Sequence, residues 1–362
     1  MLKKLIAFFK KFYLPLSALA IFSYGLYLRI LKLYHHKLWV DEYHQLNQMR
    51  HGFLEMIKGF PEKEFCAYLS GDYFLIYPFF KIFRFNKWGL SIPHIISTIA
   101  GFILIYMICR RYYKTFWGYL ISFLIVALNG TMILHATEIR TYAVLPTLAL
   151  ATFYLWPFII EEKHNFSSVK KTAIGIFFIA VIWFHVYGIL IFFLPLIYYL
   201  LVKGKDKDFK VQIKNLLRFL GLILAITMPL WIISVCGRHL GWKTHKFNVY
   251  EFIPNPWSDL SGFLKGVFGN LLGRKSLYFL LTGIFFPFLV PYKKRSEQII
   301  FLALMVLLPV GLIFLTNLKN RYWFIQRQFI WVMPYFAFFI GWSWDSAIVY
   351  FKDKLKKSKC RQ

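Results

Sequence analysis

Apolar runs of about 17–22 residues, separated by clusters of lysine and arginine, recur along the chain and restrict what it can fold into. A run of this length is long enough to cross the ~30 Å hydrocarbon core of a bilayer as an α-helix. The composition agrees, because 59% of the 362 residues are hydrophobic. Soluble domains average only about 45–50% apolar residues. We therefore expect an all-α polytopic membrane protein.

The runs predict about ten transmembrane helices. Basic residues cluster before the first run and in alternate loops, so the positive-inside rule places both termini in the cytoplasm. The stretch 172–202 fits either one very long helix or two short helices that meet at an outer turn, and two agree better with the charges. The other predicted spans lie at about 12–30, 88–109, 115–134, 142–160, 216–236, 276–291, 297–316 and 329–345.

We expect a single membrane domain over residues 1–362, with prominent outer loops at 31–87, 237–275 and 317–328. In the first outer loop, Asp41 or Glu42 opens a helical pattern, and the segment Ser70–Phe80 is too short to cross the membrane. In the fourth outer loop, 237–275, the apolar positions of 258–272 recur at helical spacing. Both loops are therefore expected to carry helices that lie in the membrane interface.

The formal net charge of +28 raises the question of a nucleic acid partner. The basic residues are scattered between the spans, which favours anionic membrane lipids and argues against nucleic acid. The four cysteines lack metal-binding spacing such as C-x-x-C. Cys66 and Cys236 are expected outside, and Cys109 and Cys360 inside, so the sequence allows one disulfide and implies no framework of them.

Ionisable and hydrogen-bonding side chains gather in the predicted outer segments, where ionisable groups beside the apolar boundary are costly. Structural roles are the alternative for each. Asp41 and Asp72 would cap helices, and Glu42 would suit a helix dipole. His185 would be a packed histidine, and Glu138 and Arg140 would form an ion pair with another segment. The tyrosines would be interfacial anchors. The candidates are Asp41, Glu42, Asp72, Glu138, Arg140, Tyr142, His185, Tyr187, Arg321, Tyr322 and Arg327.

Four motifs stand in order along the chain: Trp39–Glu42, His135–Val144, Phe184–Gly188 and Gln326–Ile330. Together they resemble motifs of the GT-C-fold glycosyltransferases, in the branch of protein O-mannosyltransferases and lipid A aminoarabinose transferases. Trp39–Glu42 resembles the acidic motif of that branch's first extracytoplasmic loop. His135–Val144 is similar to its S-x-E-A-R-x-Y-A-L pattern, and Phe184–Gly188 to its T-H-Y-Y-G turn. Gln326–Ile330, with Pro334 downstream, is similar to its P-R-Y-L-L segment.

One segment departs from the resemblance. The family usually has His-Pro-Pro-Leu-Tyr-Tyr where this chain has Ser-Gly-Asp-Tyr-Phe-Leu over residues 70–75. The resemblance therefore gives Asp72 no role.

The resemblance implies a polyprenyl-phosphate-sugar donor in the outer half of the membrane. Displacing a lipid phosphate from the anomeric carbon requires a base for the acceptor hydroxyl, and Asp41 is the candidate, with Glu42 orienting it or the acceptor. Arg140 and Arg327 are the expected phosphate ligands. His185, Tyr142 and Tyr187 are expected to add hydrogen bonds to the donor phosphate; Asp72, Glu138, Arg321 and Tyr322 form a second group of candidates.

We expect direct displacement with inversion at the sugar carbon. No cofactor is required for this chemistry, because fixed arginines can neutralise the phosphate. A divalent metal ion that takes part in this neutralisation stays an open alternative. The acceptor would be a lipid such as lipid A, a protein or a surface glycan, and the setting a bacterial inner membrane within the cell envelope, with the active site on the periplasmic side.

The alternative from another class is a transporter or flippase of polyprenyl-linked sugars. Such a protein should carry charged residues near the bilayer midplane on broken helices, usually in repeated halves. Here the candidate residues gather on one predicted face and no repeat is evident, which favours the enzyme. A non-catalytic membrane scaffold would explain the apolar composition but not an acidic pair beside several outer arginines.

Overall fold

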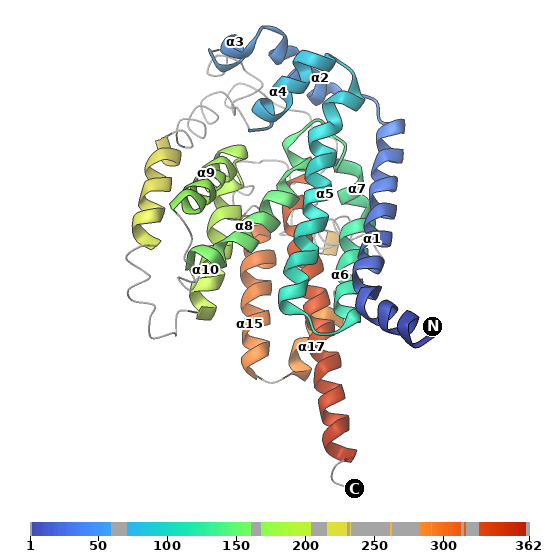
Figure 1. Ribbon diagram of the computed structural model, residues 1–362. Helices are drawn as coiled ribbons and strands as arrows, with labels where there is room; N and C mark the ends of the chain where they lie inside the picture. Colours follow the sequence, from blue (N-terminus) through green and yellow to red (C-terminus); the bar gives the residue numbers. More distant parts are fainter. Residues whose placement is uncertain are drawn as a thin grey trace. The chain divides into compact units, whose positions relative to one another are not determined.

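The computed structural model describes most of the chain, predominantly as helices (Figure 1). No strand occurs among the described residues. The all-helical fold class is therefore confirmed for this part of the chain. The described residues are 2–58, 71–160, 168–203, 216–229, 232, 261–262, 282–290, 292–312, 315 and 326–359.

The chain divides into two compact units, whose boundaries cut helix α5 (Lys87–Tyr112). Unit 1 comprises residues 1–35, 98–137 and 252–362, and unit 2 comprises residues 36–97 and 138–251. The elements of unit 1 are α1 (Leu2–His35), α6 (Phe116–Leu128), α7 (Gly130–His135), η4 (Phe286–Leu289), α15 (Tyr292–Leu302), η5 (Ala303–Leu307), η6 (Gln326–Val332) and α17 (Met333–Lys359). Those of unit 2 are α2 (Val40–Arg50), α3 (Phe53–Lys58), α4 (Gly71–Phe83), η1 (Thr141–Ala143), α8 (Leu145–Ile160), α9 (Ser168–Phe184) and α10 (Gly188–Lys203).

Three described helices are long and apolar enough to cross a membrane: Phe12–His35, Lys87–Tyr112 and Arg295–Leu312. Shorter apolar helices occupy Phe116–Leu128, Leu145–Ile160, Gly188–Val202 and Leu216–Pro229. These helices are those of a membrane protein, but the predicted count of about ten spans is not confirmed by the described residues.

The uncertain stretch 172–202 contains two helices rather than one. Helix α9 ends at Phe184 and α10 begins at Gly188, so the turn between them consists of residues 185–187. This confirms the two-helix reading that the charges favoured.

The predicted helix after Asp41 is shorter than its apolar pattern suggested. Leu46 and Met49 are buried on one face of α2, but Phe53 and Leu54 are exposed on the separate helix α3. Gly52, with φ of +96°, interrupts the helix in a backbone conformation that glycine adopts without strain. Helix α4 corresponds to the helix predicted at Ser70–Phe80 in the same loop. The helix predicted at 258–272 lies outside the described residues, except for 261–262.

In unit 1, α17 packs against α6 through glycines. A Cβ at Gly118 or Gly341 would collide with the facing helix, so the two backbones approach closely, as small residues allow in membrane helices. The buried Asp345 of α17 accepts hydrogen bonds from the Lys114 and Thr115 backbone N–H groups, at 2.9 and 2.5 Å. The carboxylate thereby satisfies donors at the start of α6.

Two further buried groups hold unit 1 together. Tyr113 donates to the Phe338 carbonyl, and burial raises the pKa of the Tyr113 hydroxyl well above its usual value, which keeps it a donor. The Arg29 guanidinium donates to the Val126 and Ala127 carbonyls at 3.0 and 2.7 Å, where α6 ends. A cation there complements the helix dipole. Of the four cysteines, Cys109 is described as a buried free thiol, and the other three lie outside the described residues.

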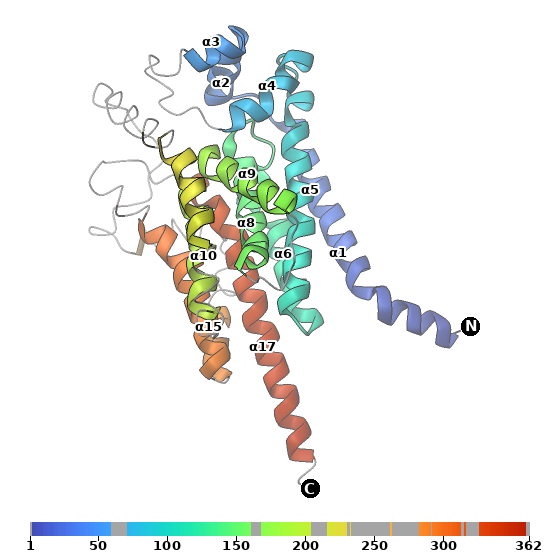
Figure 2. The same cartoon turned by 60° about the vertical axis from the view of Figure 1, so that its left-hand side comes forward.

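In unit 2, α8, α9 and α10 pack side by side through aromatic rings (Figure 2). Trp156 of α8 stacks on Phe178 of α9 at 4.6 Å between ring centroids and donates to the Phe192 carbonyl of α10. Helix α4 contacts both α2 and α9. These contacts place α2 and the end of α9, next to the turn into α10, against the same helix.

Candidate active site at the first turn of helix α2

The first turn of α2 carries the two adjacent carboxylates. Trp39 is the extended N-cap residue, and the Glu42 carboxylate accepts the Trp39 backbone N–H at 3.0 Å, as the third helical residue does in a capping box. Asp41 is therefore the second residue of the helix and not its N-cap, so the capping role considered for it does not apply.

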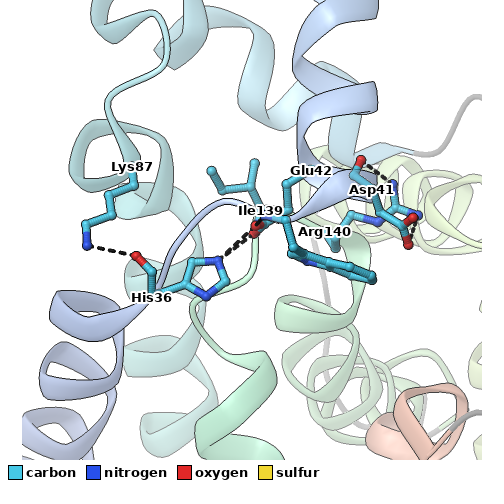
Figure 3. A network of polar contacts seen from close by, with 7 residues as sticks. His36, Asp41, Glu42, Lys87, Ile139 and Arg140 are labelled. Carbon is cyan, nitrogen blue, oxygen red and sulfur yellow. Dashed lines mark hydrogen bonds and ion pairs between the residues drawn. The ribbon is translucent and has the colours of Figure 1, made fainter. Parts of the chain in front are cut away.

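Glu42 is fully buried, and its carboxylate joins three segments (Figure 3). It accepts from the Ile139 backbone N–H at 2.7 Å and lies 2.9 and 3.0 Å from the His36 Nε2. Lys87 in turn donates to the His36 carbonyl at 2.8 Å. Buried carboxylates require such partners. The hydrogen bond from the Ile139 N–H fixes the loop before Arg140 to the start of α2.

Asp41 points away from this network and toward Arg140 (Figure 3). The Arg140 Nη2 lies 3.9 Å from the Asp41 Oδ2, and its Nη1 lies 3.3 Å from the Asp41 carbonyl and 3.5 Å from the Gln45 Oε1. The side chain of Asp41 is 34% exposed and that of Arg140 23% exposed. Two predicted motifs, 99 residues apart in sequence, thus present an accessible carboxylate beside an accessible guanidinium.

The turn between α9 and α10 continues the site. The Tyr142 and His185 rings meet edge to face at 5.6 Å between centroids, and the Tyr187 ring lies 4.8 Å from His185. The Tyr187 backbone N–H donates to the His185 Nδ1 at 3.2 Å. An accepting Nδ1 means that the ring proton lies on Nε2, which makes Nε2 a donor.

Glycines place this turn. A Cβ at Gly71, the first residue of α4, would collide with the Phe184 ring and backbone. The Gly188 N–H donates to the His185 carbonyl at 2.7 Å, and a Cβ at Gly188 would collide with the Val181 carbonyl. Only glycine permits approaches this close.

Asp72 follows Gly71 and lies within the same unit. Its carboxylate is fully buried and accepts from the Gln45 Nε2 at 2.6 Å, with the His94 Nε2 at 3.1 Å from the other oxygen. Contacts therefore run in a closed ring from α2 to the loop at Ile139, on to the turn at His185, then to the start of α4, and back to α2.

The structure thus brings together seven of the predicted residues: Asp41, Glu42, Asp72, Arg140, Tyr142, His185 and Tyr187. Glu138 is buried at the start of the loop that carries Arg140. Arg327 lies in η6 of unit 1, where only its backbone is described, and Arg321 and Tyr322 lie outside the described residues. No cluster of three or more metal-ligating side chains occurs in the described part of the chain.

Sequence reasoning missed the residues that support the site. Gln45 stands one helical turn after Asp41, so its shared face with Asp41 was a readable signal. His94 is a polar residue within the apolar run of α5, which was also a signal. Nothing local marked His36, because its role depends on the buried Glu42.

Residues 72–233, less than half of the chain, match the family model of the dolichyl-phosphate-mannose-protein mannosyltransferases. The matched segment begins at Asp72 and includes the motifs at 135–144 and 184–188. Searches of curated proteins and of solved structures found no significant match. The family match and the apolar helices support a membrane glycosyltransferase of the GT-C type.

Proposed function

We propose that this protein transfers a sugar from a polyprenyl-phosphate donor to an acceptor hydroxyl on the outer side of the membrane. The observation that carries the proposal is the accessible carboxylate of Asp41 beside the accessible guanidinium of Arg140. A base and a phosphate ligand are the two groups that such a displacement needs. Glycosyl transfer agrees with the family match over 72–233.

In the proposed reaction, the acceptor oxygen attacks the anomeric carbon while the bond from that carbon to the phosphate oxygen breaks. Asp41 takes the proton of the acceptor hydroxyl, and the electron pair of the broken bond leaves on the polyprenyl phosphate. A single displacement of this kind inverts the configuration at the sugar carbon. The leaving phosphate needs cationic donors more than it needs an acid.

Arg140 suits the role of phosphate ligand. Its contacts to Asp41 and Gln45 measure 3.3–3.9 Å, longer than the ~2.7–2.9 Å of a charge-assisted hydrogen bond. A phosphate offers the guanidinium two parallel, shorter bonds. The Nε2–H of His185 and the hydroxyls of Tyr142 and Tyr187 would add donors, and Arg327 is proposed as a second cation on the strength of its motif.

Glu42 has a supporting role in this proposal. It is fully buried and accepts from the Trp39 and Ile139 backbone N–H groups, so it holds Arg140 in place through Ile139. The positive-inside rule supports cytoplasmic termini and therefore an outer active site, and we propose a bacterial inner membrane as its setting. The acceptor class, whether lipid, protein or glycan, is set by the outer segments around this ring of contacts.

The test uses membranes that contain or lack the protein, incubated with a panel of radiolabelled polyprenyl-phosphate sugars. The proposal predicts that one donor passes its label into a product that mild acid does not release, since mild acid cleaves the glycosyl phosphate of the donor only. The anomeric configuration of that product should be inverted. A protein that only moves intact donor lipid across the bilayer would be a transporter, and that result would refute the proposal.

A further inference from the structure

Asp72 has no role in the chemistry above, yet it is one of the most deeply buried charges in the described part of the chain. Its side chain is fully buried, as is that of His94 beside it. Burying a carboxylate is costly unless donors surround it. Two side chains supply them: Gln45 from α2 and His94 from α5.

The bond from Gln45 to Asp72 decides how the Gln45 amide faces Arg140. A glutamine side chain has a donating end and an accepting end. An ionised carboxylate only accepts, so Asp72 binds the donating Nε2, at 2.6 Å. The accepting Oε1 must then face the other way, and it lies 3.5 Å from the Arg140 Nη1. The reverse orientation would set amide N–H groups against the guanidinium.

His94 fixes the carboxylate that makes this choice. Its Nε2 lies 3.1 Å from the Asp72 Oδ1, while Gln45 binds the Oδ2. The two donors approach from different helices and occupy different oxygens, so rotation of the carboxylate would break both bonds. The order of contacts is therefore His94, Asp72, Gln45, Arg140 and finally Asp41.

We infer that Asp72 is a positioning residue for the phosphate-binding Arg140, acting through the amide of Gln45. This inference rests on the proposed function and extends it, because it gives a role to a residue at which the chain departs from the resemblance. Removing the acceptor at position 72 frees the Gln45 amide to turn. Arg140 then loses one of its acceptors, the Gln45 Oε1, and the donor phosphate meets a less ordered guanidinium.

The experiment compares Asp72→Leu, Gln45→Leu and the double variant with the wild-type protein. One readout is steady-state transfer from a radiolabelled polyprenyl-phosphate hexose. The other is the binding of farnesyl phosphate, a short prenyl phosphate, to the purified protein by titration calorimetry. Tyr73→Phe is the matched control, because Tyr73 neighbours Asp72 on α4 and its hydroxyl donates to Gln48 of α2.

Each single variant should raise the donor KM and the farnesyl phosphate Kd about tenfold, equivalent to about 1.4 kcal/mol, and leave kcat within about twofold. The double variant should be no worse than either single one, since both act on one path. Asp72→Asn keeps one acceptor oxygen for its two donors, Gln45 and His94, and should lose less affinity than Asp72→Leu. Tyr73→Phe should behave as wild type.

Additive effects in the double variant, a loss in kcat alone, or an effect of Asp72→Leu equal to that of Tyr73→Phe would overturn the inference. If Asp72→Leu does not fold, Gln45→Leu decides, because an unchanged donor KM in that variant also overturns it. Arg140→Ala distinguishes a failure of the proposed phosphate site from a failure of the inference about Asp72. If farnesyl phosphate still binds that variant at full affinity, the proposed phosphate site is wrong. If Arg140→Ala loses binding while the Asp72 and Gln45 variants keep it, only the inference is wrong.

Discussion

Exchanging each of the two adjacent carboxylates for its amide should produce different losses: Asp41→Asn should lose transfer activity, and Glu42→Gln should lose stability. Asp41→Asn removes the proposed base and weakens a long ion pair, 3.9 Å, between partly exposed groups. Such a pair contributes about 0–1 kcal/mol to stability. Transfer should fall by about two to four orders of magnitude, the usual contribution of a general base, while the folded protein stays about as stable as wild type.

Glu42→Gln should lose stability and keep most of its activity. The retained oxygen can still accept the Ile139 N–H, but the new amide group faces the Trp39 N–H, a donor against a donor. One buried donor left without an acceptor costs about 1–3 kcal/mol. We expect the midpoint of thermal unfolding to fall by about 5 °C and activity at low temperature to stay within about tenfold of wild type, since Asp41 is unchanged.

The assay pairs both measurements on one preparation in lipid nanodiscs: thermal unfolding followed by tryptophan fluorescence, and radiolabel transfer well below the unfolding midpoint. Asp41→Asn should lose transfer and keep its unfolding midpoint, and Glu42→Gln should do the reverse. If Glu42→Gln abolishes transfer without a change in the midpoint, Glu42 takes part in the chemistry. Full transfer by Asp41→Asn would show that Asp41 is not the base.

Three other variants test the site and its frame. Arg140→Lys keeps the charge but loses the two-pronged geometry, so the donor KM should rise about tenfold with little change in kcat. Asp345→Ala removes the acceptor at the start of α6 and should lower stability by about 1–3 kcal/mol, whereas Asp353→Ala, exposed on the same helix, should not; thermal unfolding distinguishes them. Gly71→Ala should displace the turn between α9 and α10 and reduce transfer, while Gly130→Ala, whose Cβ would meet nothing within 4 Å, should leave transfer unchanged.

Helices follow from the sequence more readily than their ends do. The break between α9 and α10 was predictable, because an unbroken helix would have put the charged ends on opposite faces of the membrane. The predicted span 115–134 instead splits at Asn129, whose side chain accepts the Met132 N–H and starts α7. An N-cap of this kind competes with helix continuation. Asn129 lies inside an apolar run, so hydropathy alone predicts one continuous span there.

The site was predictable in its residues but not in their division of labour. Asp41 and Glu42 look alike in sequence, and helical geometry alone turns them to different faces. Whether a face is buried depends on a partner far along the chain, here the Ile139 N–H, which lies 97 residues after Glu42. Asp72 also required the fold, because its partners Gln45 and His94 come from two other helices.

Asp41 is expected to activate an acceptor for attack on a sugar held by its phosphate. The decisive measurement follows sugar transfer and farnesyl phosphate binding side by side in wild type and Asp41→Asn. The variant should bind farnesyl phosphate within about threefold of wild type, while its transfer falls by about two to four orders of magnitude. Wild-type turnover by Asp41→Asn would show that Asp41 is not the base.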